Sequence, residues 1–496
     1  MTVRQRQDVL RLATWDSTLL WYAKAVAAMR QRPATDPTSW NYQAAMHGFN
    51  AQLAAWQGIG PLPPAGDRAE YWNQCQHGSW YFLPWHRMYL AYFEQIVATA
   101  IADLGGPADW ALPFWNYSDT SHPDARALPA AFAATGTPFS PNSNPLHMPG
   151  RVLGSPGHAT MPARDVGLGA LAQASYVADV HGGSPGFGGP RTAFSHAGGQ
   201  HGALEHQPHD LVHVDVAGVM ADPRTAALDP IFWLHHANID RLWEVWLRAT
   251  PSHTNPTDTP WLNLTFQFHA KGGVPAALKA SQVLDTTKVL SGYTYEGLPS
   301  VAAHAPAPVS PALAAAASAP VPMTPSTPPE LLAATSQPQV LGSTSHTVQL
   351  AIEAARGPLS ARLRGVEALA AASAGPPPAD AFLNFENITG TGVPPVFDVY
   401  LNLPPGADPA AHEELYAGPL PLFGVASASE ADDRHSGSGM HYVLQITELL
   451  DTLRKRPDWQ DRQLQVTLVP RSALDADASV TVGRVSLYAK EAPRRR

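Results

Sequence analysis

The sequence predicts a mainly α-helical N-terminal domain and an all-β C-terminal domain of the sandwich type. In residues 1–300, apolar residues recur every three to four positions in several segments, which is the spacing of amphipathic helices. After residue 346, apolar residues occupy every second position, as they do in half-buried strands. Between these regions, residues 301–340 contain 9 Pro, 12 Ala and one charged residue, a composition typical of an extended linker.

The expected organisation is therefore a helical domain over 1–300, a Pro/Ala-rich linker over 301–345 and a β-sandwich over 346–490. In the first domain, helices are expected over residues 3–12, 17–32, 84–104 and 229–248. The last of these begins with Asp229 as a helix cap and Pro230 at the first helical position, where proline is favoured.

Residues 119–200 are rich in Gly, Pro, Ser and His and are expected to form loops. In the C-terminal domain, alternation of apolar and polar residues indicates strands over residues 347–354, 396–403, 463–470 and 483–489. Roughly six such strands with one short helix over residues 446–457 are typical of a β-sandwich.

The overall composition narrows the class of protein. The net charge is −9, with 32 Lys+Arg against 41 Asp+Glu, so nucleic acid is a poor candidate partner. A single cysteine permits no internal disulfide, which favours a reducing compartment. The N-terminus lacks the apolar core of a signal peptide, and no run of 18 apolar residues indicates a membrane span. We therefore expect a cytoplasmic protein.

Two histidines four residues apart, His209 and His213, give the strongest local signal. On a helix they share one face and can bind one metal ion, although an exposed helix with scattered histidines explains the pair equally well when it is taken alone. His235 and His236 are adjacent, so their side chains point about 100° apart on a helix. Only one of them is expected to be a ligand.

A second group of histidines lies upstream. His77 precedes the helix that carries His86, and His47 lies on an earlier helix. Taken alone, His47 also fits a hydrogen-bonded core histidine. Taken together, the two groups match two metal centres of three imidazoles each, on four helical segments and one loop. The histidines of the loops, among them His196 and His201, lack ligand spacing and are interpreted as surface or network residues.

The donor set limits the metal. Imidazole ligands suit copper, zinc, iron or nickel. Neither group contains a carboxylate that fits as a bridge, which disfavours a two-zinc hydrolase. Three neutral imidazoles leave the charge of each metal uncompensated, which favours an anionic bridging ligand from solution.

Several motifs follow one another in a characteristic order between residues 40 and 247, namely "YQAAMHG", "CQHGSWYFLPWHRMYLAYFE", "LPFWNYSD", "PHDLVHVDVAGVM" and "DPIFWLHHANIDRLW". Together they resemble the type 3 copper proteins, the family of tyrosinases, catechol oxidases and haemocyanins. "SGYTYEG" resembles the tyrosine pair that closes the catalytic core of this family. "FDVYLNLP", "ITELLDTLRKR" and "VTLVPR" resemble the β-rich shielding domain of plant polyphenol oxidases.

The resemblance implies a four-helix bundle that holds two copper ions, with O2 as co-substrate. The implied ligands of the first copper are His47, His77 and His86, and those of the second are His209, His213 and His236. Three further residues are expected beside the ligands. His235 would line the pocket, and Val214 would either tune activity or simply pack. Asp240 would either orient its neighbours through hydrogen bonds or pair with Arg241 as a surface acid.

The sole cysteine, Cys75, stands two residues before His77. Taken alone, it fits a small buried hydrophobic residue. The resemblance implies instead a thioether between its sulfur and an imidazole carbon of His77, which would fix the ring of a ligand that lies in a loop.

Two carboxylates are expected to handle protons. Glu205 matches the family's water-holding glutamate, although a first-turn helix acid is an alternative. Asp210 stands where many efficient tyrosinases carry Asn, so it could hold the same water or act as a base itself. If the two carboxylates lie close together, the pKa of one of them should rise.

The resemblance implies ortho-hydroxylation of phenols and oxidation of catechols to o-quinones, hence small phenolic substrates. The alternatives are a catechol oxidase or o-aminophenol oxidase without hydroxylase activity, and a haemocyanin-like oxygen carrier.

The resemblance also implies that the C-terminal domain covers the copper site and inserts one side chain into the substrate pocket as a plug. The candidates are Leu420, Leu422 and Phe423. Ordinary packing explains each of them individually. The sequence leaves open a homo-oligomer and a separate copper chaperone.

Overall fold

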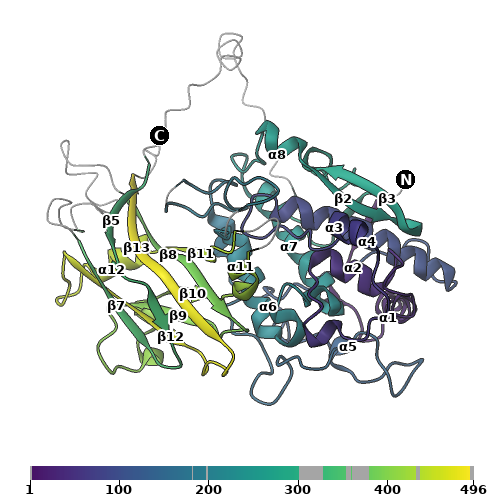
Figure 1. Cartoon of the computed structure of the whole chain (residues 1–496), viewed down its shortest axis with the longest axis horizontal. Helices are drawn as coiled ribbons and strands as arrows, with labels where there is room; N and C mark the ends of the chain where they lie inside the picture. The colour runs from purple at the N-terminus through teal and green to yellow at the C-terminus, as the bar shows by residue number, and fades with distance from the viewer. Residues whose placement is uncertain are drawn as a thin grey trace, which may run out of the picture.

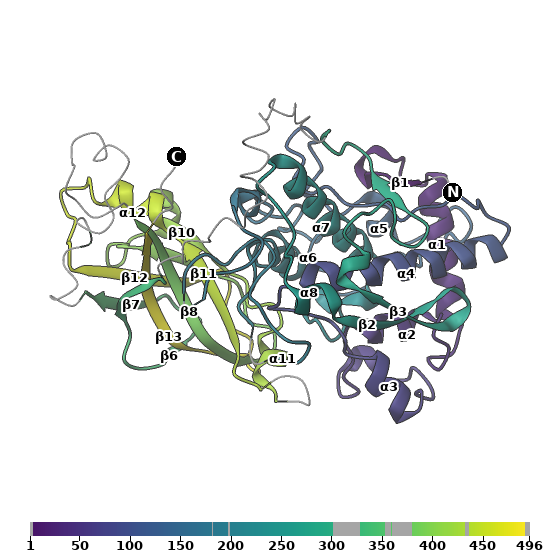
Figure 2. The same ribbon diagram turned by 90° about the horizontal axis from the view of Figure 1, so that it is seen from above.

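Two domains of different architecture lie side by side in the computed structural model (Figures 1 and 2). The structure describes residues 3–180, 182–196, 199–300, 328–352, 359, 379–431 and 436–491. The helical domain comes first, and a β-sandwich follows it. The predicted combination of a helical domain with an all-β domain is therefore confirmed. Within the described residues, no helix combines the length and the apolar character that crossing a bilayer requires.

The helices of the first domain surround one apolar core that is rich in tryptophan and tyrosine. They are α1 (Ser17–Arg30), α2 (Trp40–His47), α3 (Ala65–Tyr71), α4 (Phe82–Asp103), α5 (Ala130–Ala133), α6 (Leu211–Val216), α7 (Pro230–Ala249) and α8 (Thr259–Asn263). The predicted cap of α7 is confirmed, because the Asp229 side chain accepts a hydrogen bond from the Ile231 amide at 3.0 Å. Helices α4 and α7 pack against each other at the centre of the domain.

The helix expected over residues 3–12 is wrong. Residues Arg4–Arg6 form strand β1, which pairs in parallel with β4 (Tyr293–Tyr295), and a single 3-10 turn follows at Val9–Arg11. The physical reason is tertiary: Arg6 is buried, and its guanidinium binds Glu94 and the Tyr295 hydroxyl at 2.7 Å each. These long-range bonds outweigh the local apolar spacing. A hairpin of β2 (Thr265–Ala270) and β3 (Val274–Lys279) completes the domain.

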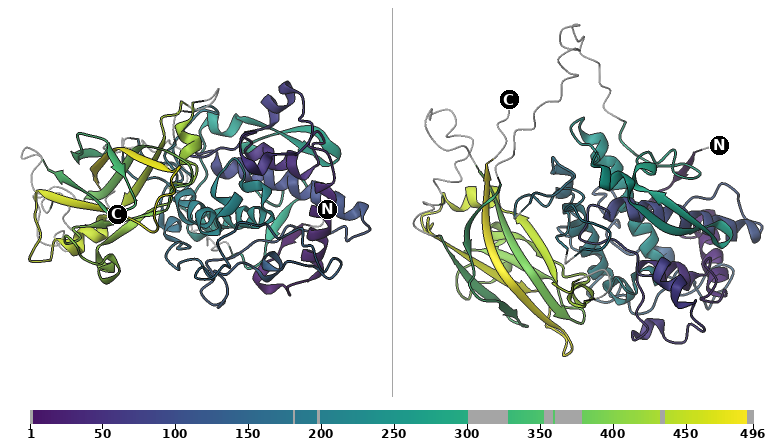
Figure 3. Two further views of the ribbon diagram at one scale, coloured as in Figure 1. Left: turned by 60° about the horizontal axis from the view of Figure 1, so that its bottom comes forward. Right: turned by 45° about the horizontal axis from the view of Figure 1, so that its top comes forward.

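The second domain consists of two facing sheets (Figure 3). The smaller sheet has the order β10 (Tyr416–Leu420), β9 (Phe397–Leu401), β12 (Gln463–Pro470) and β7 (His346–Ala351). The larger has the order β11 (Met440–Gln445), β8 (Ala379–Thr391), β13 (Ser479–Glu491) and β5 (Glu330–Ala334), with β6 (Gln339–Leu341) also on β13. Two short helices, α11 (Val425–Ser429) and α12 (Thr447–Leu453), flank the sheets.

Strands β5 and β6 lie inside the range 301–345 that the composition predicts as linker, so the second domain begins earlier than expected. Leu332 and Leu341 bury their side chains in the core of the sandwich, and both strands pair with β13. Residues 301–327 of the expected linker lie outside the described residues.

The two domains are joined by backbone pairing and by charge. The residues 199–201 add to the edge strand β11, where the His441 amide donates to the Gly199 carbonyl at 3.0 Å and the His201 amide donates to the His441 carbonyl at 3.2 Å. Elsewhere in the interface, the Arg471 guanidinium binds Asp165 of the first domain at 2.8 Å. The contact positions one face of the sandwich over the histidines of the first domain.

Candidate metal centre

The first histidine group forms where α2, α4 and the loop between α3 and α4 meet. His47 is the last residue of α2, and its Nδ1 donates to the Pro223 carbonyl at 2.8 Å. A Cβ on the next residue, Gly48, would lie 2.4 Å from the same oxygen, so only glycine permits this approach. His86 lies in the first turns of α4, and its Nδ1 donates to the Phe82 carbonyl at 2.8 Å.

The second group comes from α6, α7 and the irregular turn before α6. His209 precedes α6, within a turn that contains a non-helical residue, yet its ring still lies 4.6 Å from that of His213. The Nδ1 of His213 donates to the Met220 carbonyl at 2.8 Å. His235 and His236 on α7 complete the group, and the Nε2 atoms of His213 and His236 face each other at 3.4 Å.

The chemistry of these side chains fits two metal ions. In each group, one potential ligand atom per residue lies within 4.8 Å of the others, and no carboxylate belongs to either group in the described part of the chain. Burial lowers the pKa of His47 to about 4 and holds the pKa values of the other proposed ligands well below the usual range. The imidazoles are therefore neutral, and neutral imidazole is the form that binds a metal.

Further observations support a paired site. Among the described residues, the Nε2 atoms of His47 and His209 are buried without a hydrogen-bond partner, which is costly unless a metal occupies the position. The two groups also face each other, because the rings of His86 and His236 stack at 4.3 Å with 10° between their planes. All-imidazole donor sets without carboxylates suit borderline metals such as copper.

Two comparisons decide the family. The model of the "Common central domain of tyrosinase" matches residues 37–249, which contain both histidine groups. Tyrosinase HcTyr1 of Hahella sp. (strain CCB-MM4) is 38% identical, over 98% of this chain and 100% of its own length. The chain belongs to the tyrosinase family. Its two histidine groups form the dicopper centre of a copper-dependent oxidoreductase of this family.

The similarity extends to the second domain. The structure of latent apple tyrosinase covers 99% of this chain and 98% of its own chain, with a TM-score of 0.61 at 22% identity, and therefore shares the fold. A polyphenol oxidase of Vitis vinifera is 31% identical, but only over 56% of this chain and 45% of its own length. Residues 328–490 match a model described as a domain of unknown function (DUF7868).

Cys75 lies against the first histidine group. Its sulfur is 3.5 Å from Nδ1 and 3.7 Å from Nε2 of His77. Nearly equal distances to both nitrogens are expected when the sulfur faces Cε1, the ring carbon bonded to both. The same sulfur is 3.4 Å from Nε2 of His86. The geometry thus brings together the two residues for which the sequence predicts a thioether.

Glu205 is buried next to the first group. Its Oε1 accepts a hydrogen bond from the amide of Gly78, the residue after His77, at 2.8 Å. Its Oε2 is buried without a hydrogen-bond partner among the described residues. Burial raises the pKa of Glu205 to about 8, an effect that the nearby His201 opposes and Asp210 reinforces.

The Asp210 carboxylate is bound by side chains of the protein. One carboxylate oxygen accepts from Nδ1 of His209 at 2.8 Å. The other accepts from Nδ1 of His201 at 2.7 Å and from the Tyr442 hydroxyl at 2.9 Å. Because Nδ1 and Nε2 lie on different edges of the imidazole, Asp210 holds His209 by Nδ1 and would leave Nε2 for a metal ion. Burial raises the pKa of Asp210, and His201 opposes that rise.

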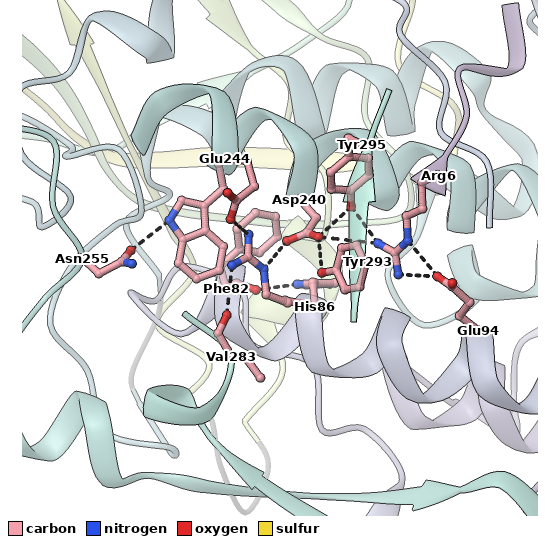
Figure 4. A network of polar contacts seen from close by, with 12 residues as sticks. Arg6, Phe82, His86, Glu94, Asp240, Glu244, Asn255, Val283, Tyr293 and Tyr295 are labelled. Carbon is pink, nitrogen blue, oxygen red and sulfur yellow. Dashed lines mark hydrogen bonds and ion pairs between the residues drawn. The ribbon is translucent and has the colours of Figure 1, made fainter. Parts of the chain in front are cut away.

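Asp240 lies at the centre of a buried network behind the metal centre (Figure 4). It accepts from Arg87 Nε at 2.5 Å and from the hydroxyls of Tyr293 and Tyr295 at 2.6 Å each. The alternative of a surface acid paired with Arg241 is wrong, because Asp240 is 3% exposed. Burial alone would raise the pKa of Asp240, but its arginine partners lower it below the ordinary value.

The network ties three segments to the metal centre. Arg87 follows the proposed ligand His86 on α4, and Asp240 lies one turn after His236 on α7. Arg87 also binds Glu244 of α7 at 2.9 Å, and Arg6 of β1 approaches Asp240 at 3.5 Å. Figure 4 shows Glu94 of α4, Asp240 of α7 and Arg6 of β1 pointing toward one another, with Tyr293 and Tyr295 of β4 beside them. The tyrosine pair expected from the sequence, Tyr293 and Tyr295, therefore joins the end of the helical domain to α7 through hydrogen bonds to Asp240.

Two residues expected beside the ligands differ in their contacts. His235 is fully buried, its ring lies 4.8 Å from that of His213, and neither of its nitrogens has a hydrogen-bond partner among the described residues. Geometrically it belongs to the second group together with His236. Val214 is partly buried and packs against the apolar core of the first domain.

A phenylalanine from the second domain reaches the centre. Phe423 packs in the apolar core of the first domain, whereas Leu420 and Leu422 belong to the core of the sandwich. The Phe423 ring stacks on that of His213 at 4.1 Å with 16° between the planes, and lies 5.8 Å from that of His77. Of the three plug candidates, Phe423 is the one that contacts both histidine groups.

Two residues near the site are not singled out as functional by the sequence. His201, interpreted as a surface or network residue, is buried and donates to Asp210, so the network alternative fits and the surface alternative does not. Tyr442 lies on β11, 232 residues after its partner Asp210. Neither residue lies in a recognisable motif, and only the docking of the two domains brings Tyr442 to Asp210.

Proposed function

We propose that this member of the tyrosinase family ortho-hydroxylates monophenols and oxidises o-diphenols to o-quinones with O2. The observation that carries the proposal is the pair of facing, buried groups of neutral imidazoles. The proposed ligands of the first copper are His47, His77 and His86, and those of the second are His209, His213 and His236.

When bound, the two copper ions supply O2 binding and two-electron redox chemistry. The chain holds the imidazoles in place. Hydrogen bonds from Nδ1 of His47, His86 and His213 to backbone carbonyls keep each Nε2 lone pair directed inward. Asp210 does the same for His209 through its carboxylate. In this proposal Asp210 is a positioning residue.

Glu205 is proposed to accept the proton of the phenol. The phenol pKa is about 10, so a base favours formation of the phenolate at neutral pH. One buried carboxylate oxygen of Glu205 has no hydrogen-bond partner in the described part of the chain, and the pKa of about 8 is close to the working range of a general base. The Gly78 amide fixes the other oxygen and thereby orients the carboxyl group.

A catechol oxidase or o-aminophenol oxidase is the second candidate. One observation favours it: the Asp210 carboxylate is bound by His201, His209 and Tyr442, so it does not offer the amide that Asn would offer to a water. An oxygen carrier is a poor fit, because the described residues contain one pair of histidine groups and the chain matches a tyrosinase over 98% of its length.

The deciding experiment is oxygen uptake by the copper-loaded chain with a monophenol and an o-diphenol in separate reactions. Hydroxylation of the monophenol without any diphenol primer is the expected result. Uptake with the diphenol alone would identify a catechol oxidase. Reversible O2 binding without turnover of either substrate would identify a carrier.

We also propose that the second domain holds the enzyme latent, with Phe423 in the space that the substrate ring needs. Its stacking on His213 supports this role. Cleavage between residues 301 and 345, or mild detergent, is then expected to raise phenol turnover. An unchanged rate would contradict latency.

We propose a cytoplasmic location, supported by a single cysteine that permits no internal disulfide.

We further propose two partners that can be tested separately, a second copy of this chain and a copper chaperone. Light scattering of the purified chain tests the first. Loading of the apoprotein with copper alone tests the second, since full activity without another protein would show that no chaperone is needed.

A further inference from the structure

A cavity of about 220 Å³ lies between α11 and the first domain and extends to the first histidine group. Figures 1 and 2 show α11 on the side of the sandwich that faces the helical domain. Its inner wall includes His47, Cys75 and His77, and Phe423 also lines it. The cavity therefore connects the dicopper centre to the outside along α11.

The charges along this cavity are few and opposite. Among the described residues that line it, Arg224 is the one permanent cation and Glu430 the one carboxylate. Arg224 Nη1 binds Glu430 Oε1 at 3.2 Å. The remaining nitrogens of Arg224 bind Asp222, with Nε at 3.0 Å and Nη2 at 2.8 Å. Asp222 thus fixes the orientation of the guanidinium and leaves Nη1 for a ligand on the cavity side.

The two partners of this ion pair differ in exposure. The side chain of Arg224 is 14% exposed, whereas that of Glu430 is 65% exposed. The backbone of Arg224 is fixed as well, because its carbonyl accepts from the indole of Trp56 at 2.6 Å. An exposed ion pair contributes little to stability, so another carboxylate can replace Glu430 at small cost.

Helix α11 places two features of the second domain at once. Phe423 precedes it and stacks on His213, and Glu430 follows it and binds Arg224. Phe423, Glu430 and Arg224 all line the cavity. An aromatic ring and a carboxylate of the second domain are thus held together in one cavity beside the guanidinium.

We propose that Arg224 is a substrate subsite that binds the carboxylate of phenolic acids, and that Glu430 occupies it in the latent chain as Phe423 occupies the ring position. The preferred substrates would then be phenols whose ring carries a short side chain ending in a carboxylate. This inference rests on the proposed phenol oxidation and names its substrate class. It adds a specificity-determining residue outside the metal centre.

The test uses the full-length, copper-loaded chain with Phe423→Ala, which vacates the ring position. Two substrates are compared, 3-(4-hydroxyphenyl)propionate and its methyl ester, which differ only at the far end: the ester replaces the negative charge with a methyl group. The expected kcat/KM ratio of acid to ester is above one. It should rise further with Glu430→Gln, because the competing carboxylate is removed, and fall by about tenfold with Arg224→Gln, because a charged hydrogen bond is lost.

Arg224→Lys keeps the positive charge but changes the shape of the group. It should therefore retain part of the preference for the acid over the ester. Arg11→Gln is the matched control, since Arg11 is an exposed arginine paired with Glu296 outside the cavity, and it should leave the ratio unchanged. Calorimetric binding of 3-phenylpropionate and its amide gives a second readout without turnover. Arg224→Gln should weaken binding of the acid and spare that of the amide.

The outcomes separate the two levels of the proposal. If both substrates are turned over but the acid-to-ester kcat/KM ratio is the same in all variants, and Arg224→Gln leaves the calorimetric binding of 3-phenylpropionate unchanged, the subsite is overturned and phenol oxidation stands. Failure of both substrates in copper-loaded chain would overturn the proposed function itself, while the calorimetric difference between acid and amide would still report on Arg224.

Discussion

At the scale of single residues, the metal centre depends on hydrogen bonds that set the direction of each imidazole. Backbone carbonyls of Pro223, Phe82 and Met220 hold three of the rings, so these contacts need no particular side chain. His209 is the exception, because a carboxylate holds it. Substitutions at Asp210 therefore act on copper through His209.

Glu205 makes the stability of the copper-free chain depend on pH. Its pKa is about 8 in the folded chain against an ordinary value of 4.5. A raised carboxyl pKa means that the folded state binds more protons than the unfolded state between these values. Stability is then greatest below about pH 4.5 for this group and falls as the pH rises to about 8, at a slope near ~1.4 kcal/mol per pH unit.

Glu205→Gln should remove this contribution, so the difference in unfolding free energy between variant and parent should change with pH over the same interval. Chemical denaturation of the apoprotein at pH 5, 6.5 and 8 measures it. A difference that stays constant with pH would show that Glu205 titrates normally. The same variant in the loaded enzyme should lower monophenol turnover.

Cys75 should be bonded to His77 in the active enzyme. The sulfur already lies 3.5–3.7 Å from both ring nitrogens. Formation of the S–C bond removes the thiol hydrogen and one ring hydrogen, with O2 as the two-electron oxidant, and would lower the intact mass by about 2 Da. Mass spectrometry before and after copper loading measures this change, and Cys75 should then resist alkylation. A freely alkylated Cys75 in active enzyme would refute the bond and leave the copper ligands as proposed.

At the scale of elements, the edge strand β11 is the structural link between the domains. It pairs with residues 199–201 of the first domain and carries Tyr442, which donates to Asp210. A carboxylate that orients a copper ligand is thus in contact with the covering domain. Displacement of the sandwich removes a donor from Asp210 as well as Phe423 from the cavity.

Tyr442→Phe should weaken the docking of the sandwich, because it leaves the buried Asp210 carboxylate with one donor fewer. Loss of such a partner costs about 1–3 kcal/mol. The detergent concentration that gives half-maximal activation should therefore fall relative to the parent chain. Tyr92→Phe, a buried substitution on α4 far from the interface, should not shift it. Equal midpoints for both variants would contradict the role of Tyr442.

Some elements could be predicted from the sequence and others could not, for identifiable reasons. Helix α7 and the ligand histidines follow from local spacing, cap residues and motif order. Strand β8 escaped prediction because residues Phe382–Phe385 and their neighbours are buried on both faces, which removes the alternation that marks a strand. The sequence leaves three plug candidates because the docking of the two domains, which no local pattern reports, puts Phe423 in the core of the first domain and Leu420 and Leu422 in the core of the sandwich.

At the scale of the whole molecule, one polypeptide contains both the helical domain with the dicopper centre and the β-sandwich that covers it. Ion pairs such as that of Arg471 with Asp165, the β11 contact and Phe423 hold the cover in place. The architecture predicts that activity depends on the relation between the domains and not on the dicopper centre alone.

Phe423→Ala should activate the full-length enzyme without cleavage, because it removes the ring that stacks on His213. Phenol turnover without detergent should rise several-fold over that of the parent chain. Leu422→Ala serves as the control: it leaves a cavity in the sandwich core at a cost of about 2–5 kcal/mol, lowers thermal stability and keeps Phe423. Greater activation by Leu422→Ala than by Phe423→Ala would show that loosening of the domain, and not the plug, limits access.

The parallel pairing of β1 with β4 joins residues near the beginning of the helical domain to its last strand. Arg6 therefore cannot reach Tyr295 until nearly 290 further residues have been synthesised. At 5–20 residues per second, translation of this interval takes roughly 15–60 s. The nascent copper domain must remain incomplete for that time, with Asp240 still lacking its tyrosine and Arg6 partners. Closure of the domain around Asp240 is thus among the last events of its biosynthesis.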